Sequence, residues 1–179
     1  MVKIVNIIAS GTLNTEIDLS QLASDIESKA EYDPDNYPGL YLRFGEEDPL
    51  VTVYRTGKYI TTGSTSKEEV HEIRERFLNL LSDMGVVSTD IDDNYQTQNY
   101  VCTGELDRQL NLNALAIGLG LENTEYEPEQ FPGLIYRPTE APCVALLFTS
   151  GRVVITGSSS LKTAEDTFQQ ISQRIAKLL

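Results

Sequence analysis

The chain has 179 residues, enough to bury a hydrophobic core as one domain or as two small ones. Its 27 acidic residues against 14 Lys plus Arg give a formal net charge of −13, the opposite of the basic footprint that most phosphate-binding proteins show. No apolar run approaches the roughly 18 residues of a membrane span and the N-terminus is too short and strand-like for a signal peptide, so we expect a cytoplasmic protein with no membrane partner.

The first half of the chain begins with a β-rich segment at 2–10, followed by a short amphipathic helix over 19–28 with Asp18 as its N-cap. A Pro-Gly turn then precedes three strand-like runs, near 39–43, 50–55 and 58–62. A long helix follows, in which Ser66 and Glu69 form a capping box. Its apolar stripe consists of Val70, Ile73, Phe77, Leu80 and Leu81.

The second half predicts the same elements in the same order. A β-rich segment at 96–103 leads to a helix over 112–119, capped by Asn111. A final helix covers 161–178. The strand-like runs between these helices lie at 133–137, 143–149 and 152–156. The segment 83–95 is an acidic link between the two halves.

An internal repeat explains this parallel order. NIIASG at 6–11 matches NYVCTG at 99–104, and GKYITTGSTS at 57–66 matches GRVVITGSSS at 151–160. The strongest match joins EYDPDNYPGLYLR, which ends at Arg43, to EYEPEQFPGLIYR, which ends at Arg137. Matching residues are 93 or 94 positions apart, too far for a short-period solenoid. We therefore expect two domains, an N-terminal repeat at 1–88 and a C-terminal repeat at 89–179.

Each repeat reads as β-α-β-β-β-α, an α+β unit whose helices cover one face of an antiparallel sheet. The other face is then open to solvent or to a ligand. Because an apolar open face is typical of a binding surface, the pattern favours a binding protein. Two such units predict a pseudo-symmetric sheet about ten strands wide.

Residues for catalysis or metal binding are scarce. His71 is the only histidine, and it lies in a helix among acidic residues. The sequence has no nucleophile–base arrangement, phosphate loop or metal-ligand spacing, so we expect no enzyme activity, no metal and no cofactor. Cys102 and Cys143 each lie in an apolar strand-like run, which favours free thiols in a reducing compartment.

The repeated blocks EYEPEQFPGLIYR and VALLFTSGRVVITG resemble the TATA-binding protein family, and NLNALAIGLGLENTEYEPEQFPGLIYR is similar to its archaeal branch. The resemblance covers about residues 4–178. It implies a saddle, one curved antiparallel sheet with helices on its convex face. It also implies a general transcription initiation factor, associated with the nucleoid of a prokaryotic cell. Such a factor binds the minor groove of the TATA box in double-stranded DNA, bends it, and recruits transcription factor B and, indirectly, RNA polymerase.

The resemblance further implies the residues that contact the groove. Asn6 and Asn99 match the family's central asparagines, whose amides donate to A or T acceptors. Thr62 and Thr156 match a second polar pair. The apolar surface around them, expected to pack on sugar edges, consists of Ile8, Ile60, Val101 and Val154.

Two aromatic wedges per repeat kink the DNA in this family. In the C-terminal repeat they correspond to Phe131 and Phe148, and in the N-terminal repeat to Tyr37 and Tyr54. Tyrosine keeps the flat ring but adds a hydroxyl that needs a partner once buried. Thr52 likewise stands where the other repeat has Leu146. We therefore expect the N-terminal half to enter the base stack less deeply or at different steps.

Cations and acids complete the implied interface. The expected phosphate contacts are Arg43, Lys58, Arg137 and Arg152. Glu127 and Glu129 fall on the loop that the family offers to transcription factor B. We interpret the acidity of the rest as adaptation to a high-salt cytoplasm.

Three alternatives stay open. A specialised regulatory paralogue would have the same fold but weak or altered DNA specificity, and would act mainly through protein partners. A duplicated small-molecule-binding domain could use the same open sheet. Without DNA, a homodimer could bury the apolar concave face.

Overall fold

The computed structural model describes residues 1–88 and 90–179, so Thr89, at the predicted repeat boundary, lies outside the described residues. The chain divides into two compact units. The first unit is Asn6–Gln98, and the second unit is Asn99–Leu179 together with Met1–Val5. Within the described ranges, no helix is both long and apolar enough to cross a membrane.

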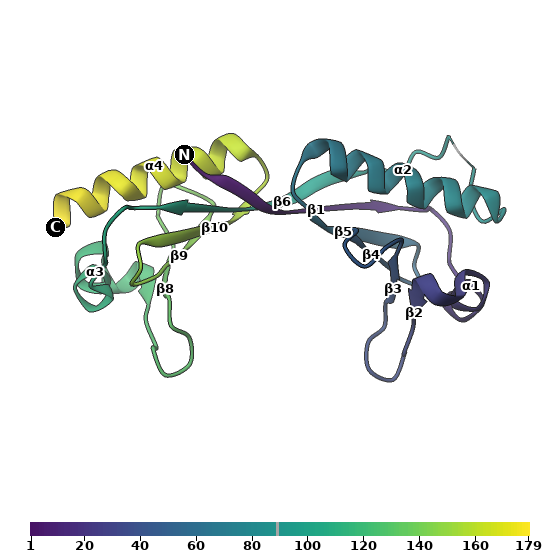
Figure 1. Ribbon diagram of the computed structural model, residues 1–179, viewed down its shortest axis with the longest axis horizontal. Coiled ribbons are helices and arrows are strands. Elements are labelled where there is room, and N and C mark those ends of the chain that lie inside the picture. The colour runs from purple at the N-terminus through teal and green to yellow at the C-terminus, as the bar shows by residue number, and fades with distance from the viewer. Residues whose placement is uncertain (89) are drawn as a thin grey trace. The chain divides into compact units, whose positions relative to one another are not determined.

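The first unit contains five antiparallel strands in the order β2-β3-β4-β5-β1. The long helix α2 covers one face of these strands (Figure 1). The strands are β1 (Lys3–Thr12), β2 (Ala30–Glu31), β3 (Leu40–Arg43), β4 (Leu50–Val53) and β5 (Lys58–Ser64). The helices are α1 (Leu19–Ile26), a 3₁₀ turn η1 (Glu27–Lys29) and α2 (Lys67–Asp83).

The second unit repeats this arrangement, with strand order β6-β10-β9-β8-β7 and α4 over the strands (Figure 1). Its strands are β6 (Gln96–Glu105), β7 (Thr124–Glu125), β8 (Leu134–Tyr136), β9 (Val144–Leu147) and β10 (Arg152–Ser158). Its helices are α3 (Leu112–Leu119), the 3₁₀ turn η2 (Leu121–Asn123) and α4 (Leu161–Leu178). The two-residue strands β2 and β7 are too short to give a sequence signal.

Strand alternation separates a helix-covered face from an open face in each unit. In β1, Ile7 and Ala9 are fully buried, whereas Asn6 and Ile8, which alternate with them, are half-buried on the other face. Under α2 the core includes Tyr59 and Phe77, whose ring centroids lie 4.8 Å apart. The apolar residues thus hold each helix against its sheet, and the open face is left for other contacts.

The helix starts follow the sequence prediction, with one change. The side chains of Asp18 and Asn111 accept hydrogen bonds from the N–H groups of Gln21 and Ala114, as N-caps do. Ser66 caps α2, but the carboxylate of Glu69 accepts from the Thr65 N–H at 2.7 Å and not from Ser66. The predicted capping box is therefore displaced by one residue.

The first helix is shorter than predicted. α1 ends at Ile26, two residues before the expected end, because Glu27 has a φ of +56° and starts the 3₁₀ turn. In the second unit the predicted end at Leu119 is confirmed. There the positive φ of +100° is taken by Gly120, which tolerates it better than Glu27.

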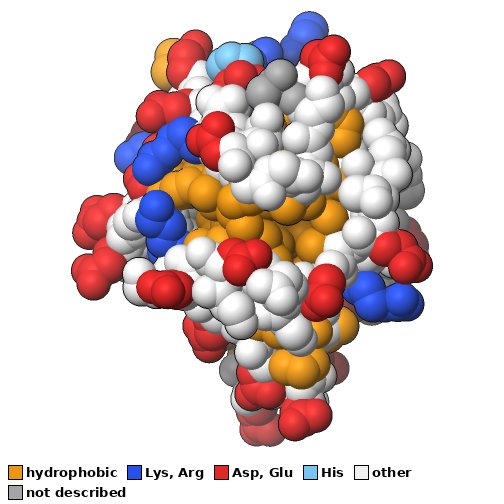
Figure 2. Space-filling model, turned by 90° about the vertical axis from the view of Figure 1, so that its right-hand side faces the viewer, with side chains coloured by type: hydrophobic (Ala, Val, Ile, Leu, Met, Phe, Trp, Pro, Cys, Tyr) orange, Lys and Arg blue, Asp and Glu red, His pale blue; other side chains and the backbone are white. Residues whose placement is uncertain are grey.

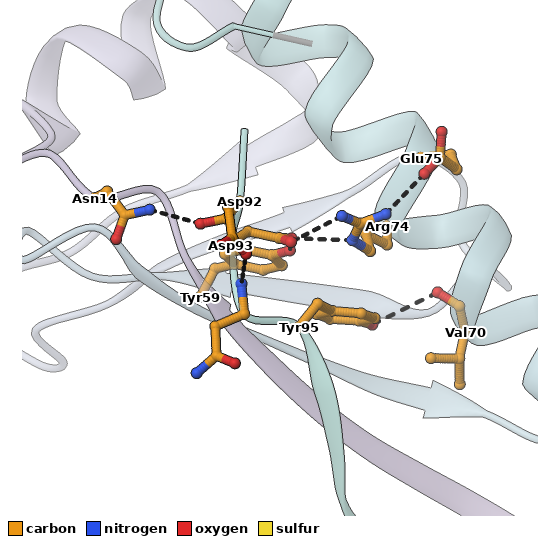
Figure 3. A network of polar contacts seen from close by, with 9 residues as sticks. Asn14, Tyr59, Val70, Arg74, Glu75, Asp92, Asp93 and Tyr95 are labelled. Atoms are coloured by element: carbon orange, nitrogen blue, oxygen red, sulfur yellow. Dashed lines mark hydrogen bonds and ion pairs between the residues drawn. The ribbon is translucent and has the colours of Figure 1, made fainter. Parts of the chain in front are cut away.

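A buried polar network anchors the acidic link to the first unit (Figure 3). Asp93 is buried and accepts two hydrogen bonds from the Arg74 guanidinium, at 2.9 and 2.7 Å, and one from the Tyr59 hydroxyl. Its carbonyl oxygen accepts from the Thr12 N–H at 2.8 Å. Tyr95 stacks on Tyr59 with ring centroids 5.7 Å apart. The end of the link is therefore part of the first unit's packing.

The second unit fills the equivalent place without charge. Phe168 is the repeat counterpart of Arg74, and its ring lies against Gly104, where an added Cβ would come within 2.4 Å of the ring. Gly11, the counterpart of Gly104, leaves room instead for Asp93 and Tyr59. One repeated position thus holds an apolar contact in one unit and an ion pair in the other.

Candidate nucleic-acid interface

A row of side chains in strand register crosses the open face of each unit. In the first unit, Ile60 lies opposite Ser10 and Thr52, and Thr52 lies opposite Tyr41. The corresponding row of the second unit is Thr103, Val154, Leu146 and Ile135. The predicted contact residues Ile60, Thr52, Val154 and Leu146 therefore share the face opposite the helices. Ile8 and Val101 share it too, because each lies two residues along its strand from Ser10 or Thr103.

Each predicted asparagine is held by one backbone group. The Gly63 N–H donates to Asn6 Oδ1 at 2.7 Å, and the Gly157 N–H donates to Asn99 Oδ1 at 2.8 Å. Because a backbone N–H can only donate, each amide must turn its oxygen to the glycine and its NH₂ group away. Asn99 Nδ2 also lies 3.1 Å from Thr156 Oγ1, which joins two of the predicted residues.

These glycines lie at irregular points of the sheet. Gly63 and Gly157 have φ values of +100° and +86°, and strand register shifts beside them. The irregularity turns the N–H out of the strand ladder toward the asparagine. Thr62 and Thr156 immediately precede these glycines and are half-buried on the open face. The Thr-Gly step therefore positions both predicted polar pairs.

The aromatic pair of the second unit packs over a glycine. Phe131 and Phe148 have ring centroids 5.9 Å apart in an edge-to-face arrangement. A Cβ added to Gly133 would lie 2.8 Å from Phe131 Cε1 and 3.0 Å from Phe148 Cε1. The Pro-Gly turn thus provides the space in which both rings sit.

In the first unit the equivalent pair is joined by its hydroxyl groups. The Tyr37 and Tyr54 oxygens are 2.5 Å apart, and the rings, 6.2 Å apart, close over Gly39. This hydrogen bond, together with burial, raises the pKa of Tyr54 to about 12. Tyr37 also stacks on Tyr41, with centroids 5.2 Å apart. Sequence reasoning missed Tyr41, although the repeat alignment pairs it with Ile135.

Tight turns fix the second aromatic of each pair. Tyr54 and Phe148 begin the turns that join β4 to β5 and β9 to β10. These turns end at Gly57 and Gly151, with φ values of +91° and +97°. An added Cβ at either glycine would come within 2.3 Å of a carbonyl oxygen, so only glycine fits.

The predicted phosphate-binding cations differ in their partners. Arg137 pairs with Glu125 at 2.8 Å, and Arg152 pairs with Glu105, its register partner across the strands, at 3.3 Å. In the first unit, Arg43 donates to the Asp48 carbonyl oxygen at 3.2 Å, and the exposed Lys58 lies opposite the neutral Thr12. Sequence reasoning missed the two carboxylates, since nothing in either local pattern indicates the pairing.

Glu127 and Glu129 are exposed on the loop between β7 and β8. The N–H groups of Gln130 and Phe131 both donate to the Glu127 carbonyl oxygen at 2.9 Å. The loop between β2 and β3 has the same turn, with Asp33 as the acceptor. Figure 2, which faces the side of the first unit, shows acidic side chains spread around a hollow of apolar ones.

These features define a class of protein, a duplicated α+β unit with an open sheet face as its candidate binding surface. Comparison with known proteins then gives the family. Residues 1–84 and 94–178 match the family described as transcription factor TFIID (or TATA-binding protein, TBP). The chain therefore belongs to the TATA-binding protein family.

Relatives in salt-loving archaea are similar along the whole chain. TATA-box-binding protein C of Halobacterium salinarum is 50% identical, with 99% of each chain covered. TATA-box-binding protein of Natronomonas pharaonis is 44% identical, over 99% of this chain and 94% of its own. The solved structure of Methanococcus jannaschii TBP matches with a TM-score of 0.82 at 39% identity, over 98% of both chains.

Family membership confirms the resemblance and the fold class predicted from the sequence. It also makes the chain a transcription initiation factor and not an enzyme.

Proposed function

We propose that the chain binds the TATA box through its open sheet face, bends the DNA, and recruits transcription factor B and thereby RNA polymerase. The observation that carries this proposal is the pair of repeat-related asparagines. Each has its oxygen occupied by a glycine N–H and its NH₂ group turned away from that bond. The NH₂ group of Asn99 donates one hydrogen to Thr156 Oγ1 and keeps its second hydrogen for a ligand. An A·T pair presents only acceptors in the minor groove, so paired amide donors fit it.

The surroundings of the asparagines suit a groove of low polarity. Ile8, Ile60, Val101 and Val154 are half-buried and can pack on sugar edges. The aromatic pairs beyond them are suited to enter base steps. Unstacking a step costs a few kcal/mol, and the larger contact area with the bent DNA offsets that cost. The kink of about 80° known for the TATA-binding protein is a property of the family and not a measurement on this chain.

A protein partner is supported by the surface of the second unit. Glu127 and Glu129 are exposed near the aromatic pair. On α3 and the turn after it, Ile117 and Leu121 are 72% and 69% exposed. In the first unit, Ser24 stands where α3 has Ile117, and the 3₁₀ turn η1 begins with Glu27 where η2 begins with Leu121. Because α1 packs on its sheet without such residues, the apolar face of α3 is not required for folding and suits transcription factor B as its occupant.

An electrophoretic shift with a TATA duplex, with and without transcription factor B, tests the proposal. We expect the protein alone to shift and bend the duplex at high salt, and the factor to shift the complex further. A duplex of the same composition in scrambled order should not shift. Absence of a shift in any salt would contradict the proposal and favour a small-molecule ligand on the open sheet.

A specialised paralogue is the second candidate. It is favoured by the tyrosine pair of the first unit and by the ion pairs that occupy Arg137 and Arg152. Such a protein would shift the duplex only when transcription factor B is present. The same experiment therefore separates the two candidates.

A further inference from the structure

The open faces of the two units differ by one kind of group. Four residues of the first unit carry a hydroxyl where the second unit is apolar. In each case the counterpart is 94 positions later, at Phe131, Ile135, Leu146 and Phe148. The four hydroxyl-bearing residues are Tyr37, Tyr41, Thr52 and Tyr54, called the hydroxyl cluster below.

The hydroxyl cluster is contiguous, with its three tyrosines half-buried and Thr52 only 5% exposed. Tyr41 and Thr52 are register partners on neighbouring strands, Tyr37 stacks on Tyr41, and Tyr54 bonds to Tyr37. The Thr52 methyl group and the rings of Tyr37 and Tyr54 surround the space that Gly39 leaves open. The second unit closes the same space over Gly133 with apolar side chains alone. Folding therefore does not require the hydroxyl groups.

The tyrosine pair has a defined set of free hydrogen-bonding positions. A phenol hydroxyl has one hydrogen to donate and also accepts. In the 2.5 Å bond between Tyr37 and Tyr54, one hydrogen is shared, so the pair keeps one hydrogen and several lone pairs for a ligand. Phe131 and Phe148 offer neither.

Minor-groove chemistry distinguishes these two surfaces. G·C differs from A·T there by the exocyclic amino group of guanine, a donor. Against the phenylalanine rings this donor is buried without an acceptor, which is costly. Against the hydroxyl cluster the amino group meets lone pairs that can accept its hydrogen.

We infer that the hydroxyl cluster is a recognition site for the guanine amino group, so that the first unit accepts a G·C pair at the base step its tyrosines contact, while the second unit excludes one. This inference rests on the proposed minor-groove function. It gives the two halves of the DNA site different sequence requirements, and so a preferred orientation on the DNA.

The test is a binding scan by fluorescence anisotropy. A TATA duplex is changed to G·C at one position at a time, and each duplex is measured with the natural chain and with Y37F/Y41I/T52L/Y54F, which gives the first unit the residues of the second. We expect the natural chain to tolerate G·C at one end of the box. Relative to its own affinity for the unchanged box, the variant should lose about tenfold in affinity at those positions only, equivalent to about 1.4 kcal/mol.

Three controls test which group is recognised. Inosine·cytosine pairs lack the amino group, so the difference between the natural chain and the variant should disappear when inosine replaces guanine. The single change Tyr54→Phe retains the ring and should give a smaller loss at the same positions. The matched variant F131Y/F148Y should gain tolerance of G·C at the opposite end. Thermal unfolding confirms that each variant is folded.

Identical scans for the natural chain and the fourfold variant would overturn the inference and leave the proposed function intact. A difference that persists with inosine would also overturn it, because the amino group would then not be the recognised group. Failure of the natural chain to bind any duplex would instead overturn the proposed function, and this inference with it.

Discussion

At the scale of single residues, the proposed interface depends on glycines as much as on the side chains proposed to contact DNA. Gly63 and Gly157 orient the asparagine amides, and Gly39 and Gly133 make room for the aromatic pairs. The contact residues are therefore held in place before any ligand arrives, which lowers the ordering cost of binding.

The asparagine arrangement predicts a specific loss in Asn99→Asp. Aspartate has nearly the same shape and still accepts from the Gly157 N–H, but it has no NH₂ group and adds a negative charge. We expect DNA affinity to fall by at least 30-fold, about 2 kcal/mol or more, in an anisotropy titration. Unfolding stability should stay near that of the natural chain. Unchanged affinity would show that the amide hydrogens do not contact the bases.

The close packing of both rings over Gly133 predicts an effect on DNA bending that can be measured separately from binding. In Gly133→Ala the new Cβ would lie 2.8 Å from Phe131 and 3.0 Å from Phe148, so both rings must move. We expect a smaller bend in fluorescence energy transfer between dyes on the two ends of a TATA duplex. Gly85→Ala is a matched control for the loss of glycine itself, since nothing lies within 4 Å of its added Cβ, although its φ of +73° makes the change strained. An unaltered bend in Gly133→Ala would contradict the role of this pair as wedges.

At the scale of elements, the end of the acidic link behaves as part of the first unit. Burial of Asp93 opposes its ionisation, but hydrogen bonds from Arg74 and Tyr59 outweigh burial and hold its pKa below the usual range. A lowered pKa in the folded state stabilises the fold above the carboxyl's ordinary pKa. That stabilisation is lost as the pH falls through the lowered value.

Asp93→Asn should therefore lower the free energy of unfolding by about 3 kcal/mol at neutral pH, because it leaves Arg74 without its buried partner. The loss should shrink as the pH is lowered through the acidic range, since the natural chain then protonates Asp93. Urea unfolding at a series of pH values measures both. A loss that stays constant down to the most acidic pH would contradict the assignment of Asp93 as the ionised partner.

The helices and most of the strands could be predicted from the sequence, because hydrophobic periodicity and cap residues are local patterns, while the site residues stay predictions. Asn6 and Asn99 became candidates through the family resemblance, and the repeat relates them to each other. The Arg152–Glu105 pair could not be predicted, because it depends on which residues face each other across two strands. Asp93 was hidden for the same reason, since its partners Tyr59 and Arg74 lie in β5 and α2. Tyr41 could have been predicted, because it lies 94 positions before Ile135 in the repeat.

At the scale of the whole molecule, a net charge of −13 must coexist with binding to a polyanion. Arg137 and Arg152 already have carboxylate partners, so fewer free cations remain to displace counterions from phosphates. We expect DNA affinity to change little from low to molar KCl. A steep, monotonic loss of affinity over that range would contradict the interpretation of the acidity as high-salt adaptation.

Glu105→Gln should change this behaviour in a predictable way. It frees Arg152 from its ion pair while retaining a side chain of the same size. We expect tighter binding at low salt and a salt dependence steeper by about one unit of logarithmic slope. Glu165→Gln, a change at an exposed acid on α4 that removes the same charge, is the control and should leave the slope nearly unchanged.

The most direct test of the account is the bend angle of a TATA duplex bound by the natural chain, measured by fluorescence energy transfer in high salt. We expect a marked shortening of the distance between the duplex ends, produced by the protein alone and absent with a scrambled duplex of equal composition. Binding that leaves the TATA duplex straight, or bends both duplexes alike, would contradict the proposed function.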